Sequence, residues 1–287
     1  MIHKISNQTK RKRRPLLNEF TPNSKQSSLM STLKITTFQA YLFWENIDKN
    51  LQNLALRLSA IREKTDLIIL PEMFNTSFTM NVEQLAEDMG GKTMEWMKKQ
   101  AEKFDCVVTG SLAIKENGRY YNRLIWMRPD GTYEKYDKRH LFGLGKEDQV
   151  YTAGTEKLFV ELNGWKICPV ICYDLRFPVW LRNNASDYDL LIVVANWPDK
   201  RVLHWKTLIT ARAIENQSFV IGVNRVGHDG NEIYHSGDSM CINPNGNTVY
   251  YKPNDEDLYT FSISLDEVTA VRRALPFLKD ADLFKLS

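Results

Sequence analysis

Cysteine is scarce in this sequence, and its placement excludes two kinds of site. The four cysteines form no C-x-x-C pair and have no His-x-x-x-His partner, which excludes a disulfide scaffold and a structural zinc site. Thiols without such partners are typical of a reducing compartment, which predicts a cytoplasmic protein. No segment approaches the roughly 18 consecutive apolar residues of a spanning helix, so the sequence predicts no integral membrane protein.

Glycine, proline and charge of one sign are also limited. With 14 Gly and 10 Pro among 287 residues, collagen and chain-wide disorder are excluded. Residues 1–30 hold seven Lys or Arg and one acid, so with an overall net charge of +3 the remainder carries −3. A mildly acidic body does not indicate a nucleic-acid-binding surface, and we expect neither nucleic acid nor membrane as a partner.

The basic segment 1–30 has no apolar periodicity, which predicts a disordered tail, because polar composition cannot offset the entropy of ordering. Its run of five basic residues, 10–14, leaves charge-driven nucleic-acid binding or targeting as an alternative. Met30 and the residues that follow it resemble the N-terminus of a natural protein. A further hypothesis is therefore that translation starts at Met30 and that the first 29 residues reflect an extended start site. No apolar core follows the basic run, which argues against a secretory signal.

From position 33, apolar runs of strand length alternate with amphipathic segments of helix length, which predicts an α/β layered fold. Strands are expected over 33–39, 66–70, 107–114, 120–127, 132–138, 166–172, 190–195, 218–224, 238–243, 247–251 and 258–263. Helices are expected over 46–61, 92–104 and 203–216, with a helix start at 179–183.

Two turns and the absence of linkers refine this fold prediction. Asn-Gly at 117–118 and Asp-Gly at 130–131 are typical hairpin turns, so we expect a mixed sheet. No linker interrupts the pattern, which predicts a single domain over residues 31–287 with a C-terminal extension from about 265.

Cys172 ends an apolar strand and is followed by Tyr-Asp-Leu-Arg-Phe-Pro, a sharp turn towards a helix. Such turns expose nucleophiles, and the N–H groups of a following helix are expected to lower the thiol pKa and to hold an oxyanion. We interpret Cys172 as a candidate nucleophile; the alternative is a small buried apolar residue, as most free cysteines are. Cys168, inside the strand, is predicted to pack in the core.

Two further residues lie at predicted strand ends. Glu72 follows Leu-Ile-Ile-Leu-Pro, where a carboxylate beside a buried strand is a candidate general base. Lys138 ends the strand at 132–138, where a cation is placed to favour a thiolate and to bind an oxyanion. The alternatives are an edge carboxylate and a solvated charge. None of the five histidines is marked out by its neighbours as the base.

Taken together, these segments resemble the nitrilase superfamily of carbon–nitrogen hydrolases. The resemblance rests on Leu-Pro-Glu-Met-Phe around Glu72, Tyr-Asp-Lys-Arg-His-Leu-Phe around Lys138 and Ile-Cys-Tyr-Asp-Leu-Arg-Phe-Pro around Cys172, and it covers about residues 33–265. Further matching segments are Asn-Trp-Pro at 196–198, His-Trp at 204–205, 211–217, 223–227 and 236–239. The pattern is most similar to the ω-amidase branch, which deamidates α-ketoglutaramate (2-oxoglutaramate) and α-ketosuccinamate.

The resemblance implies a four-layer α-β-β-α sandwich with mixed sheets, a homodimer, and no metal or organic cofactor. It also implies chemistry in which Glu72 takes the proton of Cys172, the thiolate attacks an amide carbon, and a thioester forms as ammonia leaves. Lys138 and the backbone N–H of Tyr173 would hold the oxyanion. A second glutamate of the family, which braces the lysine, corresponds by position to Glu147.

The substrate of an ω-amidase carries a carboxylate beside a ketone, and a planar guanidinium suits that group. Arg176 is the candidate, with Phe78, Asn196 and Trp197 as pocket walls. An ion pair of Arg176 with Asp174 or Glu215 is the alternative. Arg212 and Glu215, three residues apart on a predicted helix, are expected to form a structural pair.

The sequence therefore predicts an amidase that acts on a small carboxylate-bearing amide. An N-carbamoyl amino acid hydrolase or a nitrilase of the same superfamily is the enzymatic alternative, and it would differ in pocket residues around 72–80 and 196–201. A non-catalytic binding module is the third reading. Retention of Glu72, Lys138 and Cys172 together argues against that third reading.

Overall fold

The computed structural model describes residues 32–184, 186–282 and 284, whose strands form two sheets. The first sheet has the order β13-β1-β2-β3-β4-β5, and the second has the order β10-β11-β9-β8-β7-β6, with β12 paired to β11. The strands are β1 (Thr32–Gln39), β2 (Leu67–Ile69), β3 (Val107–Glu116), β4 (Arg119–Met127), β5 (Tyr133–Asp137), β6 (Val160–Leu162), β7 (Trp165–Ile171), β8 (Leu190–Ala195), β9 (Phe219–Asn224), β10 (Val226–His228), β11 (Tyr234–Ile242), β12 (Thr248–Pro253) and β13 (Asp257–Ser264).

Both sheets are mixed, as predicted. Strands β1, β2 and β3 run parallel in the first sheet, and β7, β8 and β9 run parallel in the second, while their flanking strands are antiparallel. The hairpins predicted at 117–118 and 130–131 are confirmed as the β3–β4 and β4–β5 connections. Asn117 and Gly118 have φ of 52° and 72°, the left-handed values that a tight hairpin turn requires.

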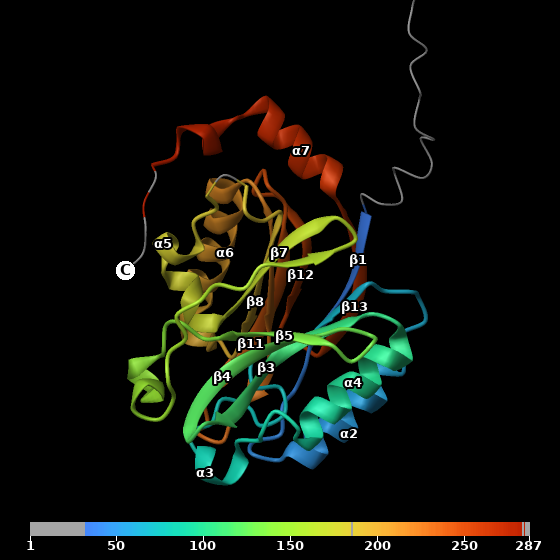
Figure 1. Cartoon of the computed structure of the whole chain (residues 1–287), viewed down its shortest axis with the longest axis vertical. Coiled ribbons are helices and arrows are strands. Elements are labelled where there is room, and N and C mark those ends of the chain that lie inside the picture. Colours follow the sequence, from blue (N-terminus) through green and yellow to red (C-terminus); the bar gives the residue numbers. More distant parts are fainter. Residues whose placement is uncertain (1–31, 185, 283, 285–287) are drawn as a thin grey trace, which may run out of the picture.

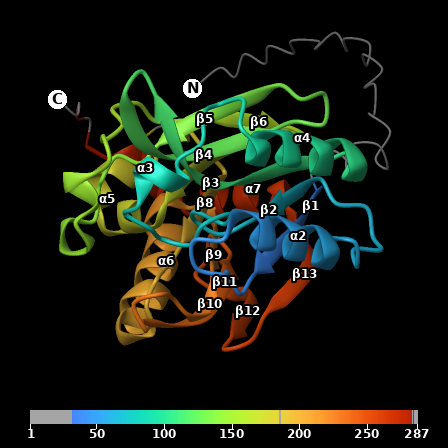
Figure 2. The ribbon, with the colours of Figure 1, turned by 90° about the horizontal axis from the view of Figure 1, so that it is seen from below.

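Helices cover the outer face of each sheet, which gives four layers, α-β-β-α (Figures 1 and 2). The helices are α2 (Ile47–Leu58), α3 (Val82–Leu85), α4 (Lys92–Phe104), α5 (Pro178–Leu181), α6 (Val202–Asn216) and α7 (Leu265–Ala274). Helices α2 and α4 lie on the first sheet, and α5 and α6 lie on the second. The predicted fold class is therefore confirmed.

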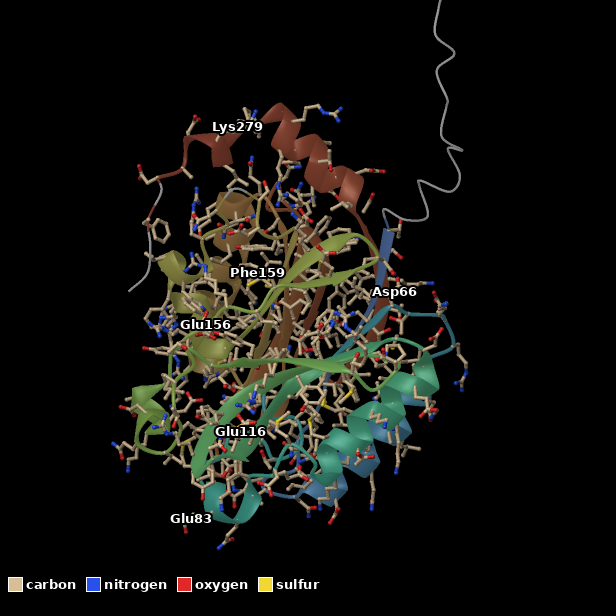
Figure 3. The ribbon with its side chains drawn as sticks, in the orientation of Figure 1. Asp66, Glu83, Glu116, Glu156, Phe159 and Lys279 are labelled. Atoms are coloured by element: carbon tan, nitrogen blue, oxygen red, sulfur yellow. The ribbon has the colours of Figure 1, made fainter. Side chains whose placement is uncertain are left out.

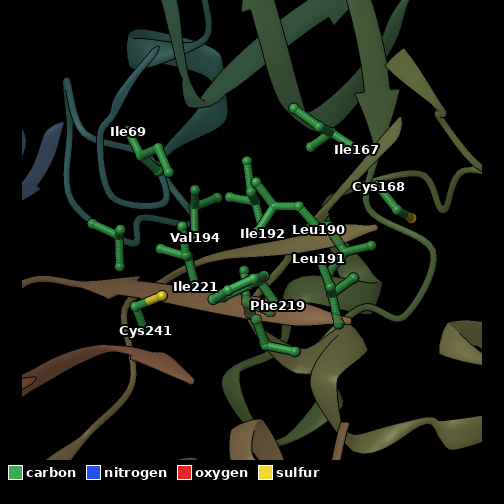
Figure 4. Close-up of a cluster of buried hydrophobic side chains, with 14 of the residues drawn as sticks. Ile69, Ile167, Cys168, Leu190, Leu191, Ile192, Val194, Phe219, Ile221 and Cys241 are labelled. Atoms are coloured by element: carbon green, nitrogen blue, oxygen red, sulfur yellow. The ribbon is translucent and has the colours of Figure 1, made fainter. Parts of the chain in front are cut away.

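Alternating side chains divide the core between the layers. Leu67 and Ile69 of β2 point between the sheets, whereas Ile68 packs in the cluster beneath α2 and α4. The second sheet is apolar on both faces, as expected of central parallel strands. Figure 4 shows part of this cluster, in which Val194 of the second sheet lies beside Ile69 of the first. Because both faces of the second sheet are buried, its strands are held in place, and so are the strand ends at one edge of the sandwich.

All of the predicted strands and long helices are present, but short elements were missed. Strands β6 and β10 have three residues each, and α3 has four, which is too short for a recognisable period. The segment after 265 forms α7, which docks on the body through Arg272, whose Nη1 lies 2.6 Å from Asp189 Oδ1. The predicted tail at 1–30 lies outside the described residues, and the single-domain boundaries stay a prediction.

Across the described ranges, no helix is long and apolar enough to cross a membrane. This agrees with the lack of long apolar runs in the sequence.

The close approach of α6 to β9 yields a test of the packing. A Cβ added at Gly222 would overlap Cδ1 of Ile209 and lie 2.5 Å from Cζ2 of Trp205. We expect Gly222→Ala to lower the free energy of unfolding by about 1–3 kcal/mol, because overpacking forces the helix off the sheet. Urea denaturation measures this change in the free energy of unfolding. Gly90→Ala is the control, since a Cβ at Gly90 meets nothing within 4 Å; equal stability of both variants would contradict the packing argument.

Candidate active site

Four polar side chains converge where strands of both sheets end. Each follows a strand: Glu72 lies beyond β2, Lys138 beyond β5, Cys172 beyond β7 and Asn196 beyond β8. All four line one cavity of about 470 Å³. The carboxyl edges of parallel strands are where α/β folds position functional groups, and here two such edges face the same cavity.

Three charged side chains that line this cavity or lie directly behind it are buried, which is unusual for their type. Glu83 and Glu156 illustrate the ordinary case, since both are exposed at the periphery of the fold (Figure 3). By contrast, Glu72 and Glu147 are 0% exposed, and Lys138 is 1% exposed. Buried charges persist only when they are paired and hydrogen-bonded, so the contacts among these three residues decide whether the arrangement is stable.

The Lys138 ammonium lies between the two buried carboxylates. Its Nζ donates to Glu72 Oε1 at 2.8 Å and to Glu147 Oε1 and Oε2 at 3.0 and 2.9 Å. Glu147 lies on a 3-10 turn, η2 (Glu147–Gln149), and its Oε2 also accepts from the backbone N–H of Phe142 at 2.6 Å. The position inferred for the bracing glutamate therefore does contact the lysine.

Asn122, in the middle of β4, also joins this cluster and was missed by sequence reasoning. Its Nδ2 donates to Glu72 Oε1 at 2.8 Å and to Glu147 Oε1 at 2.9 Å, and its Oδ1 accepts from Ser111 Oγ at 2.8 Å. A side chain with two amide N–H groups can serve two carboxylates at once. Polar residues also precede and follow it in β4, Arg119 and Arg123, so the strand sequence did not mark out Asn122.

The pKa values in the cluster reflect burial and mutual attraction. Burial lowers the pKa of Lys138, but the carboxylates of Glu147 and Glu72 outweigh burial and raise it above its ordinary value. Burial raises the pKa of Glu147, and the ammonium of Lys138 opposes that rise. Lys138 is therefore held in its charged form at neutral pH.

Cys172 begins a 3-10 turn, η3 (Cys172–Arg176), with φ of 43°, a left-handed value that costs energy for a residue with a side chain. Asp174 holds this turn in place: its Oδ2 accepts from Ile171 N at 3.1 Å and from Tyr136 Oη at 2.7 Å. Its Oδ1 accepts from the backbone N–H of His140 at 3.0 Å. Asp174 thus ties the cysteine turn to the chain that follows Lys138.

The thiol pKa changes in the direction opposite to the expected one. Burial raises the pKa of Cys172 well above its ordinary value, and the carboxylate of Glu72 raises it further, while Lys138 opposes. The expectation of a lowered pKa is wrong, because burial and the carboxylate of Glu72 outweigh the ammonium of Lys138 and the backbone N–H groups of the short turn η3. A thiol whose pKa is raised needs a neighbouring base to take its proton before it can act as a nucleophile.

The three predicted wall residues all line the cavity, and two of them also position other groups. The backbone N–H of Asn196 donates to Glu72 Oε2 at 2.8 Å, and its Nδ2 donates to the carbonyl of Glu72 at 2.6 Å. Trp197 lies beneath the guanidinium of Arg176, with Cζ 4.5 Å from the ring centroid. The Phe78 ring centroid lies 5.4 Å from Lys138 Nζ.

Arg176 also lines the cavity, and its proposed ion pair is wrong. Asp174 is engaged with His140 at 2.8 Å, and Glu215 pairs with Arg212 at 2.9 Å, as predicted for those two residues. Among the described residues, no carboxylate lies within 4 Å of the Arg176 guanidinium. Within the same ranges, no group of three or more His, Cys, Asp or Glu side chains is arranged to hold a metal ion.

Comparison with known proteins agrees with this geometry. The family model described as carbon-nitrogen hydrolase matches residues 33–273. The chain belongs to the carbon–nitrogen hydrolase family. Omega-amidase YafV of Escherichia coli (strain K12) is 42% identical to this carbon–nitrogen hydrolase over 260 residues, which cover 90% of this chain and 100% of that protein.

Two further relatives extend the comparison. The 2-oxoglutaramate amidase of Bacillus subtilis (strain 168) is 33% identical over 250 residues, covering 86% of this chain and 96% of that protein. The crystal structure of XC1258 from Xanthomonas campestris, a CN-hydrolase superfamily protein with an arsenic adduct in its active site, aligns with a TM-score of 0.87. It is 40% identical and covers 89% of this chain and 99% of that chain.

The raised thiol pKa predicts the pH dependence of alkylation at Cys172. Because the thiolate is the reactive form, reaction with iodoacetamide is expected to be slow at pH 7 and to keep rising beyond pH of about 9. Glu72→Gln removes a negative charge that raises the thiol pKa, so its alkylation at pH 8 should be several-fold faster. Intact-mass spectrometry over time at each pH measures both rates.

The matched control for this alkylation experiment is Glu83→Gln, which neutralises an exposed carboxylate outside the cavity. Peptide mapping should place the adduct on Cys172 and not on Cys168, which is buried and has a pKa raised to about 12. An alkylation rate in Glu72→Gln equal to or below that of the parent protein would refute the electrostatic argument.

Proposed function

We propose that this carbon–nitrogen hydrolase is an ω-amidase, which hydrolyses the terminal amide of a small keto acid such as α-ketoglutaramate or α-ketosuccinamate and releases ammonia. The observation that carries the proposal is one cavity with a thiol, a carboxylate and an ammonium at its base and a guanidinium without a carboxylate partner on its wall. The relatives named omega-amidase and 2-oxoglutaramate amidase support the same assignment.

In the proposed reaction, Glu72 takes the proton of the Cys172 thiol as the sulfur attacks the amide carbon. Lys138 and the backbone N–H of Tyr173 stabilise the oxyanion; the first N–H groups of a turn such as η3 have no partner within the turn. Glu72 then gives its proton to the leaving nitrogen, ammonia departs, and a thioester remains. A water molecule, deprotonated by Glu72, hydrolyses the thioester, and the sulfur recovers a proton as the acid leaves.

The remaining site residues have positioning and binding roles in this proposal. Glu147 braces Lys138 through its two contacts, and Asn196 holds Glu72 at the edge of the cavity. Arg176 attracts the carboxylate of the substrate, with Phe78 and Trp197 as apolar walls beside the chain of methylene groups. A guanidinium near the α-carbon also favours a keto acid over an amino acid, because it repels an ammonium at that carbon.

Hydrolysis of 2-oxoglutaramate is the direct test. We expect ammonia release from it to exceed release from glutamine, an N-carbamoyl amino acid and a simple nitrile by at least about 100-fold in kcat/KM, because only the keto acid satisfies both ends of the cavity.

Cys172→Ala should lower kcat by more than about 1,000-fold with an unchanged fold, because the nucleophile is lost. A coupled ammonia assay measures both.

Cys168→Ala is the matched control for the loss of the nucleophile, since Cys168 is buried behind the site and does not line the cavity; its kcat should stay within about threefold of the parent value. Preference for the carbamoyl compound or the nitrile would replace the ω-amidase assignment with the alternative it favours. Residual activity of Cys172→Ala near that of the parent protein would remove Cys172 from the reaction.

The predicted homodimer and the cytoplasmic location belong to this proposal as well. Helices α5 and α6 expose Val179, Leu203 and Ile214 by 50%, 72% and 51%, and a second copy of the chain would cover such apolar side chains. The four cysteines are free thiols, which suits a reducing compartment.

A further inference from the structure

Two arginines, not one, reach the cavity that holds the thiol. Arg176 extends from η3, and Arg201 extends from the 3-10 turn η4 (Asp199–Arg201) that precedes α6. Other buried or half-buried arginines have their donors engaged: Arg272 pairs with Asp189 at 2.6 Å, and Arg225 donates to carbonyl groups and to Ser77. Among the described residues, neither cavity arginine has a carboxylate within 4 Å.

The two guanidinium groups repel each other across the cavity. Burial lowers the pKa of Arg176, and the positive charge of Arg201 lowers it further. Holding two cations together without an acid is unfavourable unless an anion enters between them. Glu45 and Asp229 also line the cavity, but neither lies within 4 Å of these two guanidinium groups, so the part of the cavity beside the arginines is charged to receive an anionic group.

The terminal edge of Arg176 is already occupied. Its Nη1 and Nη2 both lie 3.3 Å from Nδ1 of His204, at the start of α6. That paired edge is the one that grips a carboxylate with two parallel hydrogen bonds. The face of the Arg176 guanidinium lies against Trp197 and its terminal edge lies on His204. Arg176 can therefore supply positive charge to the cavity, but it is poorly placed to form a bidentate contact with a carboxylate.

Arg201 differs from Arg176: its backbone is held by hydrogen bonds, whereas the N–H groups of its guanidinium are not engaged. Its carbonyl accepts from Trp197 Nε1 at 2.8 Å, and its N–H donates to the carbonyl of Pro198 at 3.0 Å. Its guanidinium carbon lies 5.4 Å from the ring centroid of Phe142. Within the described part of the chain, its guanidinium nitrogens make no hydrogen bond to protein, so both edges are free for a ligand.

We propose that Arg201 is the residue that binds the substrate carboxylate through a bidentate contact, with Arg176 adding its charge from the side. This inference rests on the proposed ω-amidase function, because the carboxylate belongs to the keto acid. Trp197 links the two residues: its ring supports one guanidinium, and its indole N–H fixes the backbone of the other. Arg201 is thus a specificity-determining residue for an acid group at the far end of the amide.

Kinetics with charged and uncharged amides test this assignment. For 2-oxoglutaramate, Arg201→Gln should raise KM by at least about 30-fold with kcat changed less than threefold, and Arg201→Lys should recover only part of the loss, because an ammonium lacks the planar pair of donors. Arg176→Lys should raise KM by less than about fivefold, since it keeps the charge. For butanamide, which has no carboxylate, Arg201→Gln should leave kcat/KM within threefold of the parent value.

Lys200→Gln is the matched control, since Lys200 is the exposed neighbour of Arg201 and does not line the cavity; its KM for 2-oxoglutaramate should not change. An equal rise in KM for Lys200→Gln would reduce the effect to general electrostatics and overturn the proposal. A larger effect of Arg176→Lys than of Arg201→Lys would assign the bidentate contact to Arg176 instead.

A binding measurement separates this proposal from the proposed function. Calorimetric titration of 2-oxoglutarate into Cys172→Ala, with and without Arg201→Gln, needs no turnover. If the parent protein fails to hydrolyse 2-oxoglutaramate, the ω-amidase function falls, but a 10-fold or greater loss of 2-oxoglutarate affinity in the double variant still supports Arg201 as the carboxylate ligand. Equal affinities in the two variants, or no binding by Cys172→Ala, overturn the proposal.

Discussion

The ammonium of Lys138, buried between the carboxylates of Glu72 and Glu147, is the interaction on which the site depends. Burying three charges is unfavourable unless each finds a partner, and removing one partner from such a cluster typically costs about 3–5 kcal/mol. Here every charged oxygen and nitrogen has a contact, with Asn122 serving both carboxylates. The cluster also ties β2, β4 and the turn η2 to the end of β5, so local structure and site geometry are set together.

The sandwich architecture supplies the rest of the site. Glu72 comes from the first sheet, whereas Cys172 and Asn196 come from the second, and the two hydrogen bonds from Asn196 to Glu72 cross from one sheet to the other. The carboxylate and the thiol therefore meet only when the sheets pack face to face. Burial at this junction raises the thiol pKa, and the carboxylate of Glu72 raises it further.

Charge is distributed unevenly within the cavity. At one end a protonated thiol, an ammonium and carboxylates are balanced against each other; at the other, Arg176 and Arg201 have no acid beside them. An amide nitrogen near the sulfur and an anionic group near the arginines would satisfy both ends. The arginines are held by aromatic faces, Trp197 and Phe142, which position a cation without neutralising it.

The sequence by itself determined the layered fold, because long apolar runs and helical periods are local signals, and it singled out Glu72, Lys138 and Cys172 by their places at strand ends. It also predicted that Arg212 and Glu215 pair, since three residues separate them on one helix. The three-residue strands β6 and β10 were missed because they are too short to show a period.

Only the tertiary structure decided which distant residues complete the site and how the thiol titrates. Asn122 reads as one of several polar residues in the first half of a strand, and Arg201 reads as one of several charges at a helix start; their roles depend on groups remote in the sequence, Glu72 and Glu147 for Asn122 and Phe142 and Arg176 for Arg201. The thiol pKa depends on burial between two sheets, which outweighs the local backbone N–H groups that the sequence suggested. Local periodicity thus fixes the elements, whereas electrostatics and specificity depend on contacts between elements that are remote in the sequence.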